Sequence, residues 1–171
     1  FGSHGDRLWH LARGQDHRRV ERESRPKSIS NETTFGVDTA DRDVLEGHVW
    51  RLAEKVADRA KAKGLAGRTV TLKLKRADHR ILSRRTSLPE PTQMADRLFR
   101  AARSLIEQAG EAGPFRLIGV GLSDLCSDAG AGLSEDLLDP GAAARARAER
   151  ATDTIRARFG AGAIMKGRAL R

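Results

Sequence analysis

The residues from Arg68 to Arg76, RTVTLKLKR, alternate between apolar and polar side chains. Successive side chains of a β-strand point to opposite faces of a sheet, so one half of this segment can face a core while the other half faces outward. The inward set is Val70, Leu72 and Leu74, and the outward set is Thr71, Lys73 and Lys75. Such a strand belongs in a sheet that has one covered and one open face.

Three further segments are expected to form strands. Residues 27–35, KSISNETTF, alternate in the same way, and residues 115–122, FRLIGVGL, are apolar on both sides, as a central strand is. Residues 78–88 are rich in strand formers, but their alternation breaks in the middle and permits a bulge. The pattern therefore leaves open which face Arg84 and Arg85 occupy.

Two segments show the helical period instead. Residues 41–63 carry apolar side chains at i, i+4, i+7 and i+11 and stop at Gly64. Residues 94–108 carry a second apolar stripe, preceded by Thr92 as a suitable N-cap. The order β-α-β-β-α-β predicts an α+β fold, a four-stranded sheet with two helices packed on one face, together with a separate C-terminal helix.

Changes in composition divide the chain into five segments. They are a helix over 1–14, a charged linker over 15–26, a globular domain over 27–125, an acidic linker over 126–140 and an Ala/Arg-rich helix and tail over 141–171. Phe1 cannot be an initiator methionine, which favours a piece cut from a longer protein. The lone cysteine, Cys126, can close no intrachain disulfide.

The net charge of +9 directs attention to polyanions as partners. No apolar run approaches the roughly 20 residues that cross a bilayer, so we expect a monomeric, cytoplasmic protein without membrane contact.

Basic residues cluster in the second and third predicted strands: Lys73, Lys75, Arg76, Arg80, Arg84 and Arg85. Outward residues of a strand repeat about every 6.7 Å, close to the spacing of phosphates along one DNA strand. Small hydroxyls that would let a phosphate approach the backbone lie nearby, at Ser28, Ser30, Ser83 and Thr86.

An RNA-recognition module shares this order of elements, but it stacks bases on aromatic side chains of its central strands. Aromatic residues are only 4% of this chain and tyrosine is absent, so contact with the nucleic-acid backbone fits better.

Catalysis is not expected. The close carboxylate pairs, Asp41 with Asp43 and Glu135 with Asp136, lie at a helix start and in a linker, and we predict no catalytic or metal-binding residues.

The segments KSISNETTF, GRTVTLKLKRADHRILSRRTSLPEPT and FRLIGVGLSDL resemble the little-finger domain of Y-family DNA polymerases, most closely those of the bacterial polymerase IV type. The resemblance implies a sheet that holds primer-template duplex DNA during error-prone translesion synthesis, near the bacterial nucleoid. It also implies a set of backbone contacts, namely Lys27, Ser28, Ser30, Lys73, Lys75, Arg80, Ser83, Arg84, Arg85 and Thr86. RLWHLARG, near the start, resembles the end of the thumb of these enzymes.

The catalytic carboxylates of the family, and the Mg²⁺ that they hold, belong to a palm domain that this chain lacks. The resemblance therefore implies a fragment that has no cofactor of its own and is inactive alone. It also implies a short peptide that binds the sliding clamp, for which the nearest match is Ser134-Glu135-Asp136-Leu137-Leu138. Two alternatives remain, a protein-interaction module that recruits a processivity factor and a freestanding RNA-binding domain. About four to six neutralised phosphates would give DNA binding a salt slope of roughly −4 to −5.

Overall fold

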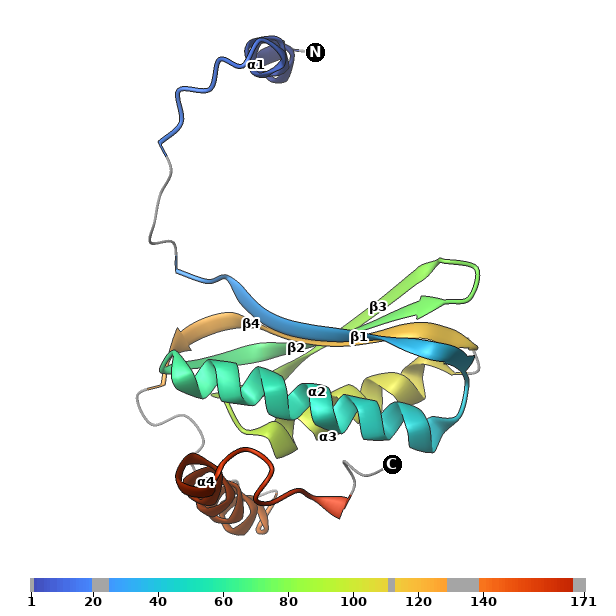
Figure 1. Ribbon diagram of the computed structural model, residues 1–171, viewed down its shortest axis with the longest axis vertical. Coiled ribbons are helices and arrows are strands. Elements are labelled where there is room, and N and C mark those ends of the chain that lie inside the picture. Colours follow the sequence, from blue (N-terminus) through green and yellow to red (C-terminus); the bar gives the residue numbers. More distant parts are fainter. Residues whose placement is uncertain (1, 20–24, 111–112, 129–138, 168–171) are drawn as a thin grey trace.

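A computed structural model describes residues 2–19, 25–110, 113–128 and 139–167. The described part contains four helices and four strands in the order α1-β1-α2-β2-β3-α3-β4-α4 (Figure 1). Their bounds are α1 Gly2–Ala12, β1 Ser28–Thr39, α2 Arg42–Ala62, β2 Leu65–Arg76, β3 Ile81–Thr92, α3 Ala95–Ala109, β4 Phe115–Ser127 and α4 Ala142–Phe159. The predicted β-α-β-β-α-β order is thereby confirmed from β1 to β4.

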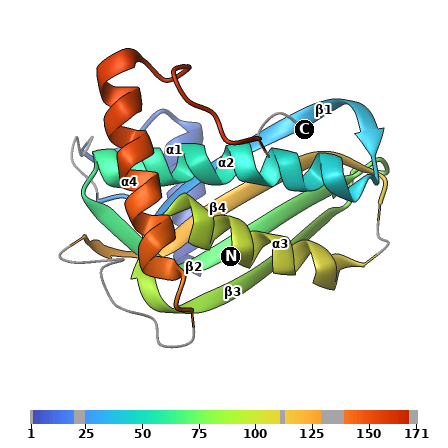
Figure 2. The same ribbon diagram turned by 90° about the horizontal axis from the view of Figure 1, so that it is seen from below.

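The four strands form one antiparallel sheet in the order β1-β4-β2-β3. The last strand in the sequence, β4, lies between β1 and β2, as its two-sided apolar pattern predicts. It extends past residue 125, where we expected a linker, because Cys126 and Ser127 pair with Ala66 and Leu65. Helices α2 and α3 cover one face of the sheet and leave the other open (Figures 1 and 2).

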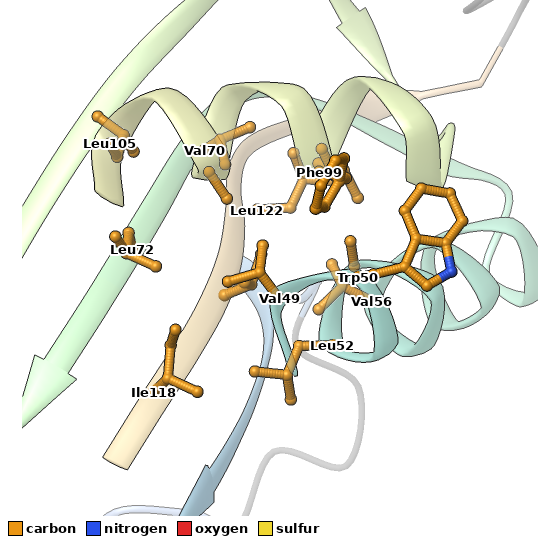
Figure 3. Packing of buried hydrophobic residues seen from close by; sticks show 14 of the residues in the cluster. Val49, Trp50, Leu52, Val56, Val70, Leu72, Phe99, Leu105, Ile118 and Leu122 are labelled. Atoms are coloured by element: carbon orange, nitrogen blue, oxygen red, sulfur yellow. The ribbon is translucent and has the colours of Figure 1, made fainter. Parts of the chain in front are cut away.

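The core lies between this sheet and the two helices. The inward side chains of β2 are almost fully buried, with Val70 and Leu72 at 0% exposure and Leu74 at 1%. Ile118 and Leu122 of β4 point the same way and meet Val49, Val56 and other side chains of α2 and α3 (Figure 3). The period of two in RTVTLKLKR thus places one half of β2 in the core and the other half on the open face.

Helix α2 begins and ends as its sequence predicts. Asp41 is the N-cap, and its carboxylate accepts hydrogen bonds from the N–H groups of Asp43 and Val44. The apolar stripe is buried along the whole helix, at Leu45, Val49, Leu52, Val56 and Ala60. Gly64, at a φ of 59°, follows the last turn in a left-handed conformation that glycine adopts readily.

The start of α3 differs from the prediction. Thr92 is not its N-cap, since that position belongs to Met94, whose side chain caps nothing. Thr92 accepts a hydrogen bond from the Met94 N–H at 3.1 Å instead. The N–H groups of Ala95 and Asp96 donate to the carboxylate of Glu149, at 2.8 and 3.3 Å, so the helix is capped by a residue of α4. A local sequence pattern cannot contain a cap that comes from so far along the chain.

Helix α4 crosses α2 and α3 on the side away from the sheet and is held there mainly by charges (Figure 2). The Lys61 ammonium lies 2.7 Å from Glu149 and 2.6 Å from Asp153, and Arg156 lies 3.0 Å from Glu54. Burial opposes the charge on Lys61, yet its two acidic neighbours raise its pKa above the ordinary value. These ion pairs are partly shielded from water. Because water then screens the attraction less, they are stronger than fully exposed pairs.

Helix α1 stands apart from the sheet in Figure 1, and none of its residues is buried. Leu8 and Trp9 are 63% and 52% exposed, although their spacing is helical. The Arg13 guanidinium lies 3.6 Å from the centre of the Trp9 ring. The apolar side of this helix therefore contacts none of the core described above.

Candidate nucleic-acid interface

The open face of the sheet consists of four cross-strand rows, fixed by the register of the strands. Paired residues in neighbouring strands point to the same face, so each row runs across the sheet from β1 to β3. The rows are Ser28–Ser123–Thr69–Ser87, Ser30–Gly121–Thr71–Arg85, Glu32–Gly119–Lys73–Ser83 and Thr34–Leu117–Lys75–Ile81. We call this surface the open face.

Two glycines of β4 lower the middle of the open face. Gly119 and Gly121 present no side chain, and a shallow depression of about 360 Å³ lies over them, bordered by Ser30, Thr71 and Lys73 among others. A Cβ at Gly119 would lie 3.0 Å from the Cβ of Glu32, so a side chain at this position would press on Glu32 and shift it. The centre of the surface is therefore shaped by missing side chains.

The cations of the open face are unequally placed. Lys73, Lys75 and Arg85 lie on β2 and β3, whereas β1 contributes hydroxyls and the acid Glu32 to the same rows. The Lys73 ammonium is 2.9 Å from the Glu32 carboxylate, and the two side chains are 39% and 51% exposed. Within the described ranges, positive charge that is not paired with an acid is consequently concentrated toward the β2–β3 side.

The pairing of β3 answers the question that its broken alternation leaves open. Residues 81–87 pair with residues 75–69 of β2 without interruption, so no bulge lies there. Arg85 pairs with Thr71 and faces the open side, whereas Arg84 pairs with Leu72 and faces the helix side. Thr86 likewise pairs with Val70 on the helix side. Of the predicted contacts, these two do not share the open face.

Other predicted contacts lie at the margins of the open face. Arg76 follows an irregularity in the pairing of β2 with β4, and its N–H donates to the Arg80 carbonyl at 2.9 Å. Arg80 lies in the turn before β3, where its side chain is 82% exposed and its guanidinium is 3.7 Å from the Asp78 carboxylate. The turn also holds His79 at a φ of 68°. Lys27 is exposed immediately before β1.

The hydroxyl groups of the open face are not all equally available. Ser28 and Ser30 are exposed on β1, and Ser83 is exposed on β3. Thr69, in contrast, donates to the carboxylate of Asp124 at 2.5 Å and lies 3.1 Å from the Ser87 hydroxyl. Two hydroxyls of the row at this end of the face, those of Thr69 and Ser87, are therefore already hydrogen-bonded within the protein.

Sequence reasoning missed Glu32 and the two glycines of β4 as parts of this surface. The signal for Glu32 was present, because it continues the alternation of Ser28 and Ser30 along the first strand. Gly119 and Gly121 alternate with apolar residues in GVGL, which indicates an outward face that has no side chains. Their meeting with Lys73 required the strand order, which the sequence did not supply.

The described residues bring together no group of three or more His, Cys, Asp or Glu side chains that could hold a metal ion. Within the same residues, no helix is both long and apolar enough to span a membrane. The predicted clamp-binding peptide, residues 134–138, lies outside the described ranges. The open face thus presents cations, hydroxyls and backbone groups, and the described residues form no metal-holding cluster.

Comparison with known proteins places this chain in a family. Residues 26–136 match the impB/mucB/samB family C-terminal domain. DNA polymerase IV 1 of Mesorhizobium japonicum is 44% identical over 167 residues, which are 98% of this chain and 38% of that protein. DNA polymerase IV of Caulobacter vibrioides is 43% identical over 171 residues, which are 100% of this chain and 42% of that protein. The chain spans about two fifths of the length of these relatives.

Solved structures agree at the level of the fold. The Y-family DNA polymerase chimera Dbh-Dpo4(243-245)-Dbh matches with a TM-score of 0.58 and 20% identity, over 74% of this chain and 36% of that chain. The insertion ternary complex of Dbh DNA polymerase matches with a TM-score of 0.52 and 18% identity, over 71% of this chain and 35% of that chain. The chain therefore belongs to the impB/mucB/samB family, of which it carries the C-terminal domain, and it shares the fold of these polymerase structures.

Proposed function

We propose that this chain is the DNA-holding part of a translesion DNA polymerase and that its open face binds the backbone of duplex primer-template DNA. The observation that carries the proposal is the placement of Lys75, Arg85 and Ser83 on one uncovered surface, opposite the helices. Arg80 and Lys27 extend the positive charge at two margins of this surface. The relatives named DNA polymerase IV support the same reading.

The geometry favours contact with phosphates over the reading of bases. Outward side chains repeat about every 6.7 Å along a strand, which brings successive cations near successive phosphates. Hydroxyls such as Ser28 and Ser30 can donate to phosphate oxygens but do not distinguish base pairs. Arg84 and Thr86 face the other side of β3, so we propose that they reach DNA only around the free edge of that strand. The resulting grip tolerates any sequence.

The RNA-binding alternative is not favoured by this surface. A module that binds single-stranded RNA stacks bases on aromatic rings of its central strands. In the four rows described above, the central strands β4 and β2 present Leu117, glycines, hydroxyls and lysines, and no aromatic ring. Stacking therefore has no platform there.

The polymerase activity itself is proposed for the longer protein and not for this chain. Nucleotidyl transfer needs carboxylates that hold divalent metal ions, and the relatives are more than twice as long as this chain. We propose that those carboxylates and their Mg²⁺ lie outside it. The chain alone then binds DNA without extending a primer.

Binding of a labelled primer-template duplex should weaken steeply with salt. Because Lys73 is already paired with Glu32, we expect the smaller end of the range, a slope of log K against log salt of about −4. Arg85→Ala should make this slope about 0.9 less steep, since one phosphate contact is lost. Fluorescence anisotropy at several salt concentrations measures both values.

Lys55→Ala is the matched control, because it removes one exposed positive charge from α2, away from the open face. Equal effects of the two substitutions would show that only net charge matters and would contradict the proposed face. An affinity that does not depend on salt would exclude backbone binding altogether.

We also propose that residues 134–138 bind the ring-shaped sliding clamp, which would keep the polymerase on DNA. Two leucines in an acidic segment suit an apolar pocket on a partner. The double variant Leu137→Ala, Leu138→Ala should lose at least about ten-fold in clamp affinity in a pull-down or surface-plasmon titration. Full clamp binding by this variant would remove the peptide from consideration.

A further inference from the structure

We infer that Glu32 cancels the attraction of Lys73 for phosphate at the centre of the open face and so sets where the DNA backbone lies on it, an inference that rests on the proposed function. Glu32 belongs to β1, and Lys73 belongs to β2, with β4 between them. Their charged groups nevertheless meet, with the Lys73 ammonium 2.9 Å from the Glu32 carboxylate. An acid is thus placed inside a surface that otherwise collects cations.

The meeting depends on Gly119. Strands that are not neighbours lie about 9.5 Å apart, twice the spacing of adjacent strands, and a side chain on the intervening strand normally separates them. Gly119 stands between Glu32 and Lys73 in their row and has no side chain. The two long side chains therefore reach across the depression and close it with an ion pair.

This ion pair changes what an approaching phosphate encounters. A phosphate near Lys73 is attracted by the ammonium and repelled by a carboxylate at almost the same distance, so the two effects largely cancel. The pair is only half exposed, which limits how far water screens the repulsion. The Glu32–Gly119–Lys73 row is therefore close to neutral toward DNA.

The positive charges in the two neighbouring rows are not cancelled in this way. Arg85 lies one row from Lys73 on β3, and Lys75 lies one row to the other side on β2. A duplex backbone is consequently held most firmly over the β2–β3 side and is not drawn to the Glu32–Gly119–Lys73 row. Glu32 acts on DNA through Lys73 and by repulsion, and it is a positioning residue of the grip.

Glu32→Gln tests the inference with little change in shape. The variant should bind the primer-template duplex about five-fold more tightly at 0.1 M salt, with a slope about 0.9 steeper, because Lys73 becomes available to one more phosphate. The Glu32→Gln, Lys73→Ala double variant should lose this gain and bind about as the native chain does, because both charges of the pair are then absent. The control is Glu107→Gln, which removes from α3 an acid that is paired with Arg42 of α2. This variant should bind as the native chain does.

The outcomes separate this inference from the function on which it rests. Unchanged or weaker binding by Glu32→Gln, while Arg85→Ala still weakens binding, would overturn the role of Glu32 and leave the DNA-binding face intact. Retention of the full gain by the Glu32→Gln, Lys73→Ala double variant would do the same. If neither Arg85→Ala nor salt alters binding, the proposed face itself fails.

Discussion

Replacing Glu149 with alanine is expected to release α4 from the domain. Glu149 is 4% exposed and joins α4 to two other helices, since it accepts from the Ala95 and Asp96 N–H groups and pairs with Lys61 at 2.7 Å. Removing one partner of a buried ion pair costs up to about 3–5 kcal/mol, and the share from Lys61 is reduced here because Lys61 keeps Asp153 at 2.6 Å. The Ala95 and Asp96 N–H groups, however, lose their acceptor. Undocking of α4 lets water reach these groups, so the helix should leave rather than hold them unsatisfied.

Hydrogen exchange measured by mass spectrometry distinguishes release from general unfolding. Amides of residues 142–159 should exchange at least about ten-fold faster in Glu149→Ala, while those of β2 and β4 keep their protection. Glu149→Gln should give a smaller effect, because its amide oxygen can still accept from α3 while the charge opposite Lys61 is lost. Arg147→Ala, exposed on the same helix, is the control. Unchanged protection of α4 in Glu149→Ala would show that its other contacts suffice.

The elements whose formation depends on local periodicity could be predicted from the sequence. Strand β2 and helix α2 carry their patterns within themselves, so the faces of Leu72 and Lys73 and the buried stripe of α2 follow from spacing alone. Arg84 and Arg85 show where this reasoning stops. Their faces are set by the register of β3 against β2, and register is a property of the pair of strands.

Contacts between distant segments could not be predicted for the same reason. Nothing near Thr92 indicates that the N–H groups of α3 are satisfied by Glu149. The docking of α4 was equally hidden, because its large apolar residues, Ile155 and Phe159, are 38% and 67% exposed and its attachment relies on charges. An apolar stripe indicates a helix that packs against a core. An arginine-rich segment with a few acidic residues, in contrast, has the same pattern as an ordinary solvated surface.

Leu72→Ala is expected to lower the free energy of unfolding by about 3 kcal/mol, within the usual range of 2–5 for such a truncation. Leu72 is 0% exposed in a central strand, where it points into the core beneath the helices (Figure 3). Removing most of its side chain leaves a cavity that the surrounding side chains fill only in part. Urea denaturation followed by circular dichroism measures the loss as a lower midpoint at an unchanged slope.

The neighbouring residue provides the control, because it lies on the same strand but on the opposite face. Thr71→Val keeps the shape and the strand propensity of the side chain and should change stability by no more than about 0.5 kcal/mol. Arg85→Ala, in the same row as Thr71, should weaken DNA binding without lowering stability. Equal destabilisation by Leu72→Ala and Thr71→Val would mean that both faces are packed. A sheet covered on both sides would have no open face left for DNA, so the stability of these two variants also tests the proposed function.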